Sequence, residues 1–261
     1  MAYSKIKYAV ENGVATVTMA DPQTLNAVAP DMVGELADAF NKAAREARCV
    51  VFTGEGRGFS SGANLSPSGE IATESGRIDV GQRLESHYNP FVTLLRDLPI
   101  PFVTAVNGAA AGVGCSFALM GDLIIAAESA YFLQAFRRIG LVPDGGATYL
   151  LPRMIGRARA MELMLLGEKL PALKALEWGL INRCVPDADL LATATALALE
   201  LASGPKALSM IRKLAWAGLD AHWLDQLQAE RDMQREAGRT QDFIEGVSAF
   251  YQKRPAKFTG S

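Results

Sequence analysis

Alternating runs of apolar and polar residues divide the chain into strand-like and helix-like segments. Residues 6–10 and 14–19 predict two short strands, because the pair Asn12-Gly13 between them favours the tight turn of a β-hairpin. Residues 31–47 carry apolar side chains at helical spacing and predict an amphipathic helix. The same reasoning predicts further strands at 49–53, 102–106, 122–127 and 180–185 and a helix at 81–97.

Beyond residue 187 nearly every segment has the apolar spacing of a helix. The predicted helices cover 188–202, 205–217, 222–237 and 241–253. Earlier in the chain, strands separated by helical segments predict repeated ββα or βα units with parallel pairing. We therefore expect an α/β fold, with a core region at 1–186 and a helical C-terminal region at 187–261.

Composition fits an ordinary globular protein and excludes several classes. Hydrophobic residues make up 49% of the 261 residues and charged residues 21%, which is enough for a sizeable core. The 26 Lys and Arg residues nearly balance the 28 Asp and Glu residues, so no dense cationic face for nucleic acid is expected. Three cysteines without a CxxC pair and two histidines provide no spacing typical of a metal site.

The most apolar stretch, residues 102–127, is rich in glycine and is interrupted by Asn107 and Asp122. A membrane span is therefore not expected. The first residues also lack the apolar segment of a signal peptide. Together these features predict a cytoplasmic protein.

Two familiar motifs are incomplete, and a third leaves an alternative open. Gly112-Val113-Gly114 begins like a dinucleotide-binding fingerprint, but Phe117 stands where the third glycine belongs, and no P-loop occurs. Residues 58–62 match GxSxG, the pattern of a hydrolase with Ser60 as nucleophile. Its histidine would be His87 or His222, and the residues after Ser60 predict a loop rather than a helix.

The glycine-rich segments 58–62 and 107–114 each follow a predicted strand. Glycine permits unusual backbone conformations and close approach, so the N–H groups of such segments are free to point at a ligand oxygen. Two N–H donors from separate loops are what an oxyanion hole requires, and they stabilise charge that develops during a reaction. Taken together, the two segments predict an oxyanion hole rather than two simple turns.

The sequences FSSGANL (59–65) and VNGAAAGVG (106–114) resemble the paired signatures of the crotonase, or enoyl-CoA hydratase/isomerase, superfamily. The resemblance continues through residues 139–156, 167–185 and 246–255 and covers essentially the whole chain in order. It implies a crotonase-like spiral of ββα units whose C-terminal helices form homotrimers or dimers of trimers. It also implies an acyl-CoA thioester substrate, with no separate cofactor because coenzyme A is part of the substrate.

By match to these motifs, the oxyanion donors are the N–H groups of Ala63 and Val113. Family hydratases carry two catalytic glutamates, but the matching positions here are Ser116 and Phe136. Phenylalanine transfers no proton and serine is a poor base, so a two-glutamate hydration mechanism is not expected.

A carboxylate occurs instead at Asp144, in a Val-Pro-Asp stretch that resembles ring-1,2-epoxyphenylacetyl-CoA isomerases and related enoyl-CoA isomerases. In those enzymes the aspartate shuttles a proton. Burial beside Leu141, Val142 and Phe136 is expected to raise its pKa toward neutrality. The competing interpretation is that Asp144 only caps a helix that begins near Gly145.

The resemblance also assigns substrate contacts outside the proton-transfer groups. Phe250 and Lys253 match positions that in relatives meet the adenine and 3′-phosphate of coenzyme A, often from a neighbouring subunit. The full set of expected substrate-binding residues is Leu25, Ala27, Ser61, Gly62, Leu65, Gly112, Ser116, Phe136, Phe250 and Lys253.

The sequence thus predicts an enoyl-CoA isomerase and leaves three alternatives open. The first is hydration, with Asp144 and Ser116 positioning water. The second is a non-catalytic acyl-CoA binder, and the third is the GxSxG hydrolase. The acyl group and any role for His87 are not predicted.

Overall fold

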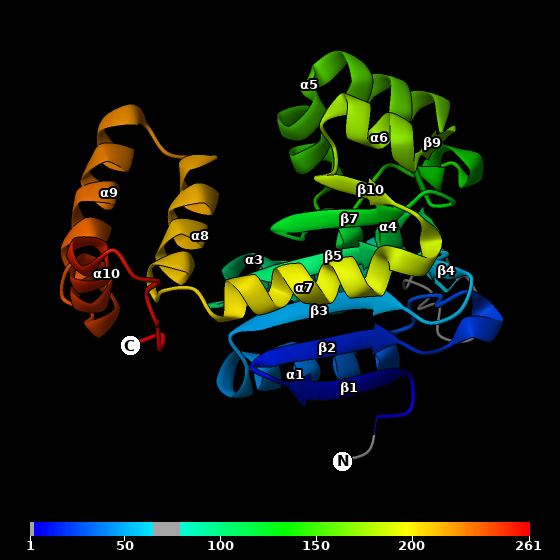
Figure 1. The fold of residues 1–261 in the computed structure, drawn as a ribbon. Coiled ribbons are helices and arrows are strands. Elements are labelled where there is room, and N and C mark those ends of the chain that lie inside the picture. Colours follow the sequence, from blue (N-terminus) through cyan, green and yellow to red (C-terminus); the bar gives the residue numbers. More distant parts are fainter. Residues whose placement is uncertain (1–2, 65–78) are drawn as a thin grey trace.

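The computed structural model describes residues 3–64 and 79–261 and contains two sheets (Figure 1). In the larger sheet the strand order is β1-β2-β3-β5-β7-β10, and every neighbouring pair is parallel except β1 and β2. Asn12 and Gly13 both have positive φ, as the predicted hairpin turn requires. The six strands are β1 (Ile6–Glu11), β2 (Val14–Met19), β3 (Cys49–Gly54), β5 (Phe102–Val106), β7 (Leu123–Ala127) and β10 (Arg183–Val185).

The smaller sheet has the order β4-β6-β8-β9, with β9 antiparallel to its neighbour. Its strands are β4 (Gly58–Ser60), β6 (Ala109–Ala111), β8 (Tyr131–Leu133) and β9 (Lys169–Pro171). The first three follow directly after β3, β5 and β7 of the larger sheet, and each pair is followed by helix. This repetition confirms the expected spiral of ββα units.

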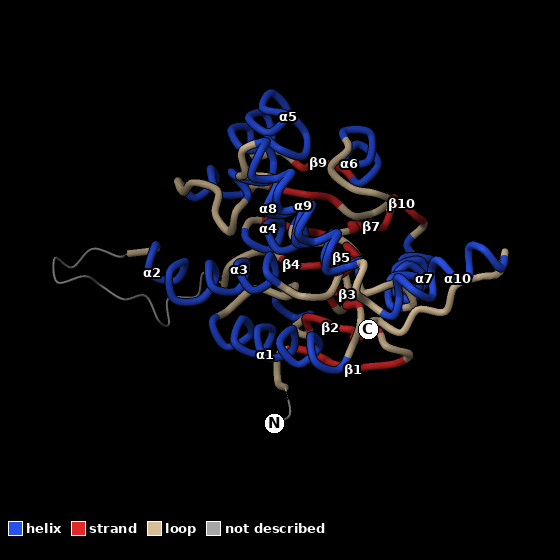
Figure 2. The backbone as a smooth tube through the Cα atoms, turned by 90° about the vertical axis from the view of Figure 1, so that its left-hand side faces the viewer, coloured by secondary structure: helices blue, strands red, loops and turns tan. Residues whose placement is uncertain are grey.

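Helices cover both faces of the larger sheet. Helix α1 (Pro30–Glu46) and helix α3 (Asn89–Asp97) lie on one face, and α7 (Leu190–Ala202) lies on the other (Figures 1 and 2). The remaining core helices are α2 (Gly81–Arg83), α4 (Val113–Leu119), α5 (Ala147–Leu166) and α6 (Ala172–Trp178). Single turns of 3-10 helix occur at η1 (Pro22–Thr24), η3 (Ala135–Ile139) and η4 (Asp187–Asp189).

A cluster of edge-to-face aromatic rings joins the helices to both sheets. The ring of Phe40 on α1 lies 5.4 Å from Phe52 on β3, and Phe52 lies 5.1 Å from Phe59 on β4. On the other side of Phe40, Phe91 of α3 lies 4.9 Å from Phe117 of α4. Such pairs contribute about 0.5–1.5 kcal/mol each beyond the burial of their area. The cluster therefore fixes β4 and α4, which carry the two glycine-rich segments.

The last three helices stand beside the main body (Figure 1): α8 (Ala207–Gly218), α9 (Trp223–Ala237) and α10 (Gln241–Gln252). Helix α8 is anchored by the buried side chain of Arg212, which donates to Asp122 Oδ2 at 2.8 Å. The same guanidinium also donates to the carbonyl oxygens of Leu95, Arg96 and Leu98, at and just beyond the end of α3. The division at residue 186 stays a prediction. Helix α7, which follows that residue, packs on the larger sheet of the core.

Three predictions of secondary structure were wrong in detail. The strand predicted at 180–185 covers only Arg183–Val185, because Leu180 still belongs to the turn after α6, where its N–H donates to the Ala175 carbonyl. The helix predicted at 81–97 is interrupted by a π-helical turn, η2 (Leu84–Tyr88). The segment after β3 was expected to be a loop, but it forms β4. No helix of the described residues is long and apolar enough to cross a membrane.

Candidate active site

The segment after β4 presents the N–H group of Ala63. Ala63 forms a parallel bridge with Val28, in which Val28 N–H donates to the Gly62 carbonyl at 2.7 Å and Asn64 N–H donates to the Val28 carbonyl at 3.0 Å. Successive amides of an extended segment point to opposite sides. The Ala63 N–H therefore points away from Val28, and none of residues 3–64 and 79–261 accepts a hydrogen bond from it.

The second N–H group belongs to Val113, the first residue of α4. The first N–H groups of a helix have no partner inside it and are available to a ligand. Gly112 precedes the helix with φ +52° and ψ −132°, a conformation that side chains rarely adopt, and its own N–H donates to the Leu133 carbonyl. Gly112 thus turns the chain so that the Val113 amide faces outward from the helix start.

The two glycine-rich segments are in contact. A Cβ atom placed on Gly112 would lie 3.8 Å from the Cα of Gly62, and one placed on Gly62 would lie 2.9 Å from the Ala111 carbonyl oxygen. A Cβ atom on Gly114 would lie 2.5 Å from the Cβ of Ser60, which leaves room only for glycine. The glycines therefore permit a close approach that brings the peptide groups before Ala63 and Val113 together.

A loop that follows η1 and carries Leu25 and Ala27 lies along the Ser61–Ala63 segment. The Leu25 carbonyl accepts a hydrogen bond from Ser61 N–H at 2.8 Å, and Ala27 N–H donates to Thr24 Oγ1. Ser61 Oγ donates to the Thr24 carbonyl at 2.9 Å. These contacts place Leu25, Ala27 and Ser61 next to Gly62.

Asn26 holds this loop, and the sequence analysis did not identify it. Its buried side chain donates to the carbonyls of Glu55 and Gly58 and accepts from Asp21 N–H. The backbone of Asn26 has φ +55°, which asparagine tolerates better than most residues. A lone polar residue in the apolar run Leu-Asn-Ala-Val was the signal that could have identified it.

The loop before α5 brings Asp144 to α4. Ser116 Oγ donates to the backbone carbonyl of Asp144 at 2.7 Å. A Cβ atom on Gly145 would lie 2.8 Å from Ser116 Cβ and 3.3 Å from Val113 Cγ2, so this backbone packs directly on the helix that carries the second amide. The predicted neighbours Val113, Ser116 and Asp144 therefore form one cluster.

The Asp144 carboxyl is partly buried, and its Oδ1 atom has no hydrogen-bond partner among the described residues. Loss of solvation raises the pKa of this carboxyl to about 6. The capping interpretation is wrong, because α5 begins at Ala147 after Gly146 and has no side-chain cap. The side chain is therefore not used by the helix, and a carboxyl with a pKa near neutrality exchanges protons readily in both directions.

Two aromatic side chains lie near these groups. Phe136 is buried in η3, and its Cζ atom would lie 3.9 Å from a Cβ on Gly112. Tyr88 is also buried, and its pKa is raised to about 12, first by burial, while Arg83 lowers it and the charge of Asp144 raises it. The sequence analysis did not identify Tyr88.

The predicted contacts Phe250 and Lys253 are not part of this cluster. Helix α10, which carries Phe250 and is followed by Lys253, lies at the opposite end of the molecule from β4 (Figure 1). Leu65 lies outside the described residues. His87 forms a local hydrogen bond, Nδ1 to Ser86 Oγ at 2.7 Å.

Ser60 has no features of a nucleophile. It is the last residue of β4 and is fully buried, and its hydroxyl donates to the Asn26 carbonyl at 2.8 Å. The same oxygen accepts from Gly62 N–H. The hydroxyl thus supports the Ala63 segment, which argues against the GxSxG hydrolase.

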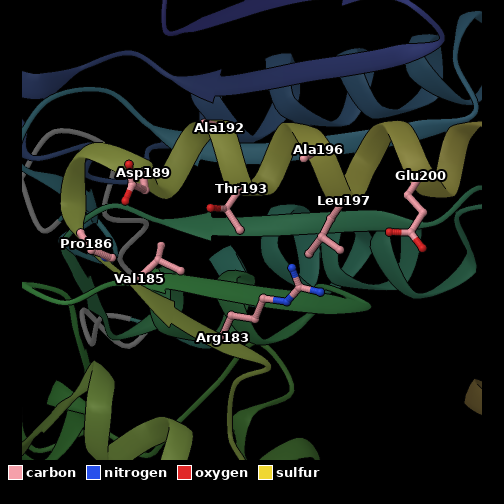
Figure 3. A pocket seen from close by; sticks show the side chains of 9 residues that line it. All are labelled: Arg183, Val185, Pro186, Asp189, Ala192, Thr193, Ala196, Leu197 and Glu200. Carbon is pink, nitrogen blue, oxygen red and sulfur yellow. The ribbon is translucent and has the colours of Figure 1, made fainter.

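A separate cavity of about 470 Å³ lies between β10 and α7 (Figure 3). Arg183 and Glu200 line one end of it, and Asp189 lines the other. It shares no residue with the cluster around Asp144. In the part of the chain that the structure describes, no group of three or more His, Cys, Asp and Glu side chains is arranged to hold a metal ion.

The chain is similar to known proteins along nearly its whole length. The chain matches the family described as Enoyl-CoA hydratase/isomerase over residues 9–261. It is 46% identical to 1,2-epoxyphenylacetyl-CoA isomerase of Escherichia coli, over 96% of this chain and 97% of that protein. It is 44% identical to a Rhodobacter capsulatus protein named Probable enoyl-CoA hydratase, over the full length of both. The crystal structure of an enoyl-CoA hydratase from Polaromonas matches with a TM-score of 0.89 at 32% identity, covering 97% of this chain and 99% of that one.

Proposed function

The chain belongs to the enoyl-CoA hydratase/isomerase, or crotonase, family of acyl-CoA enzymes, and we propose that it is an enoyl-CoA isomerase. In this proposal the N–H groups of Ala63 and Val113 hold the thioester oxygen. The carboxylate of Asp144 moves the proton.

The observation that carries the proposal is the hydrogen bond from Ser116 Oγ to the Asp144 carbonyl. A hydratase of this family uses two glutamates, and the positions that match them are Ser116 and Phe136. The backbone of Asp144 and Gly145 packs against Ser116, so a glutamate side chain at position 116 would meet that backbone. Asp144 is then the carboxylate of the cluster around α4, and one carboxylate suffices for moving a proton.

The reaction needs one base and one site for negative charge. Asp144 takes a proton from C2 of a 3-enoyl-CoA, and the electrons of that C–H bond delocalise over the thioester oxygen, C2 and C4. The two amides stabilise the oxygen of this dienolate, and each such donor contributes roughly 10²–10³ in rate. Asp144 returns the proton to C4, which leaves the double bond between C2 and C3.

The acyl group is the least constrained part of the proposal. The name of the 46% identical relative supports a ring-epoxide substrate, in which the same hole and carboxylate would assist opening and expansion of a strained ring. Phe136 beside Gly112 provides an apolar aromatic wall that is compatible with a ring. A straight-chain enoyl group fits the same proton transfer.

Hydration is the second candidate, and it is favoured by the name of the 44% identical relative. Asp144 and Ser116 would together position a water molecule. Ser116 already donates its hydrogen to the Asp144 carbonyl, so its oxygen would only accept from that water. A non-catalytic acyl-CoA binder would need the amides but not the raised pKa of Asp144.

We further propose that the protein is a cytoplasmic homotrimer or dimer of trimers. Phe250 and Lys253 would then contact coenzyme A bound to a neighbouring subunit. The distance of α10 from β4 within one chain supports this, because these residues do not reach the cluster of their own subunit (Figure 1). Several large apolar side chains of α9 and α10 are also exposed, including Trp223, Leu224 and Phe250.

The test is to incubate the protein with 3-enoyl-CoA and, separately, with 2-enoyl-CoA in deuterated water. Mass spectrometry then follows deuterium at C2 and C4. The isomerase is expected to migrate the double bond and to incorporate deuterium at these carbons. A 3-hydroxyacyl product would favour the hydratase. An acyl-CoA that binds to the protein and stays unchanged would favour the binder.

A further inference from the structure

Two side chains of the segment 81–88 contact the bridge that presents the first amide. Tyr88 Oη donates to the Val28 carbonyl at 3.0 Å, and Val28 is the bridge partner of Ala63. Arg83 Nη1 donates to the Asn64 carbonyl at 3.0 Å. Asn64, which follows Ala63 along the chain, and Val28, which faces it across the bridge, are therefore both held by the continuous segment 81–88.

The π-helical turn explains how both side chains reach the bridge between Val28 and Ala63. In η2 the Asn89 N–H bonds to the Leu84 carbonyl, five residues earlier. A π turn stacks residues five apart, whereas an α-helix would rotate them to different faces. Arg83 and Tyr88 are five residues apart, so the turn directs both to one side.

Tyr88 also contacts the element that carries the second amide. Its ring lies 6.2 Å from the ring of Phe117 in an edge-to-face arrangement, and Phe117 belongs to α4, which begins at Val113. The Tyr88 side chain is 3% exposed, so its ring is fixed by packing. One rigid side chain thus touches the bridge that presents Ala63 and the helix that presents Val113.

We propose that Tyr88 is a positioning residue that sets the distance between the Ala63 and Val113 amides, with Arg83 as a second support. This inference rests on the proposed oxyanion hole. A change of about 1 Å in the position of a catalytic group can cost roughly 10² in rate. The hydroxyl of Tyr88 acts through the Val28 carbonyl and transfers no proton, and its pKa of about 12 keeps it protonated at neutral pH.

The test compares Tyr88→Phe with the wild type. The variant keeps the ring on Phe117 and removes one hydrogen bond, and the Val28 carbonyl still accepts from Asn64 N–H, so the fold should persist. We expect kcat to fall roughly tenfold while KM changes less than twofold. Tyr8→Phe is the matched control, because Tyr8 lies on the edge strand β1 and its hydroxyl donates to Glu46, so the variant should leave kcat unchanged.

A second measurement reports the hydrogen bonds from the two amides and does not require isomerisation. Infrared difference spectra of bound [1-13C]acetyl-CoA measure the carbonyl stretch, which falls in frequency when the oxygen accepts hydrogen bonds. The smallest acyl group is chosen because it fits whatever the pocket shape. We expect a downshift with the wild type and with Tyr8→Phe and a clearly smaller one with Tyr88→Phe. Arg83→Gln changes a partly exposed residue and should also give a smaller downshift than the wild type. It keeps the test usable if Tyr88→Phe fails to fold.

The outcomes separate the inference from the proposed function. If Tyr88→Phe and Arg83→Gln both keep the wild-type downshift and kcat, Tyr88 has no positioning role and the inference is overturned. If the wild type shows the downshift and Tyr88→Phe loses it, but no double bond migrates, the inference stands and the isomerase proposal fails. If the wild type shows no downshift, both fail.

Discussion

The hydroxyl of Ser116 donates a hydrogen bond of 2.7 Å to the backbone carbonyl of Asp144. This bond joins the helix that presents the Val113 amide to the loop that carries the proposed base. The carboxylate and the oxyanion donor are therefore positioned relative to each other by one short side chain, at a position where family hydratases carry a catalytic glutamate.

Replacing Ser116 tests this link. Ser116→Ala leaves the Asp144 carbonyl without this donor, and we expect kcat to fall roughly tenfold, as for loss of one positioning hydrogen bond. Ser116→Glu is expected to lower the melting temperature, because Gly145 packs against this position. A Glu variant that is as stable as the wild type and produces 3-hydroxyacyl-CoA would show that the site is a hydratase site lacking only its acid.

The pH dependence of the rate follows from the raised pKa of Asp144. A base must be ionised, and burial raises the pKa of this carboxyl to about 6. We expect kcat/KM to rise about tenfold per pH unit below 6 and to be flat from pH 7 to 8, measured with 3-enoyl-CoA. A profile that is flat down to pH 4.5 would exclude Asp144 as the base.

The same shift predicts a pH-dependent gain in stability for Asp144→Asn. The folded protein holds the Asp144 proton more tightly than the unfolded chain, whose ordinary carboxyl pKa is 3.8. The resulting stabilisation is complete below that value and is lost as pH rises through about 6. The uncharged variant avoids this loss, so it should melt roughly 5–10 °C above the wild type at pH 8 and close to the wild-type temperature at pH 4.

Asp97→Asn is the control for this comparison, since its side chain is 69% exposed. Its melting temperature should follow the wild type at both pH values. An Asp144→Asn variant that melts below the wild type at pH 8 would mean that the carboxylate is stabilised by its surroundings.

Asn26 should contribute strongly to stability, although it is not expected to contact the reacting atoms. Its buried side chain makes three hydrogen bonds to backbone groups, and its removal leaves the Glu55 and Gly58 carbonyls and the Asp21 amide without that partner. We expect Asn26→Ala to lower the free energy of unfolding by about 3 kcal/mol in denaturant titrations. Asn41→Ala, on the exposed side of α1, should change it by less than about 0.5 kcal/mol. Equal losses in the two variants would rule out this role.

The sequence predicted those helices and strands that are long enough for their hydrophobic pattern to be recognised. Strands β1 and β2 and helix α1 show alternation or helical spacing, and β3 is a continuous buried run of six residues. In contrast, β4, β6, β8 and β9 have three residues each and show no period. The sequence predicted a helix start near Gly145 but no end for it, because α5 contains Pro152 and a Gly156 with φ +76°, both of which normally end a helix.

The glycine-rich segments predicted an oxyanion hole because the need for glycine is visible in the sequence itself, and the resemblance to the family motifs assigned its donors to Ala63 and Val113. Asn26 and Tyr88 were missed for the opposite reason. Their partners are backbone carbonyls, and Tyr88 lies 60 residues from Val28 along the chain. Every residue has a backbone carbonyl, so the residue types do not show which carbonyls accept a side-chain hydrogen bond. Only the fold reveals such contacts.

The most direct test of the account is the rate at which Asp144→Asn exchanges the C2 protons of an acyl-CoA for deuterium. With the dissociation constant for the acyl-CoA unchanged within twofold, exchange should fall by roughly 10²–10⁴, because the variant keeps both amides but has no base. Exchange within threefold of the wild-type rate would contradict the assignment of Asp144 as the group that moves the proton.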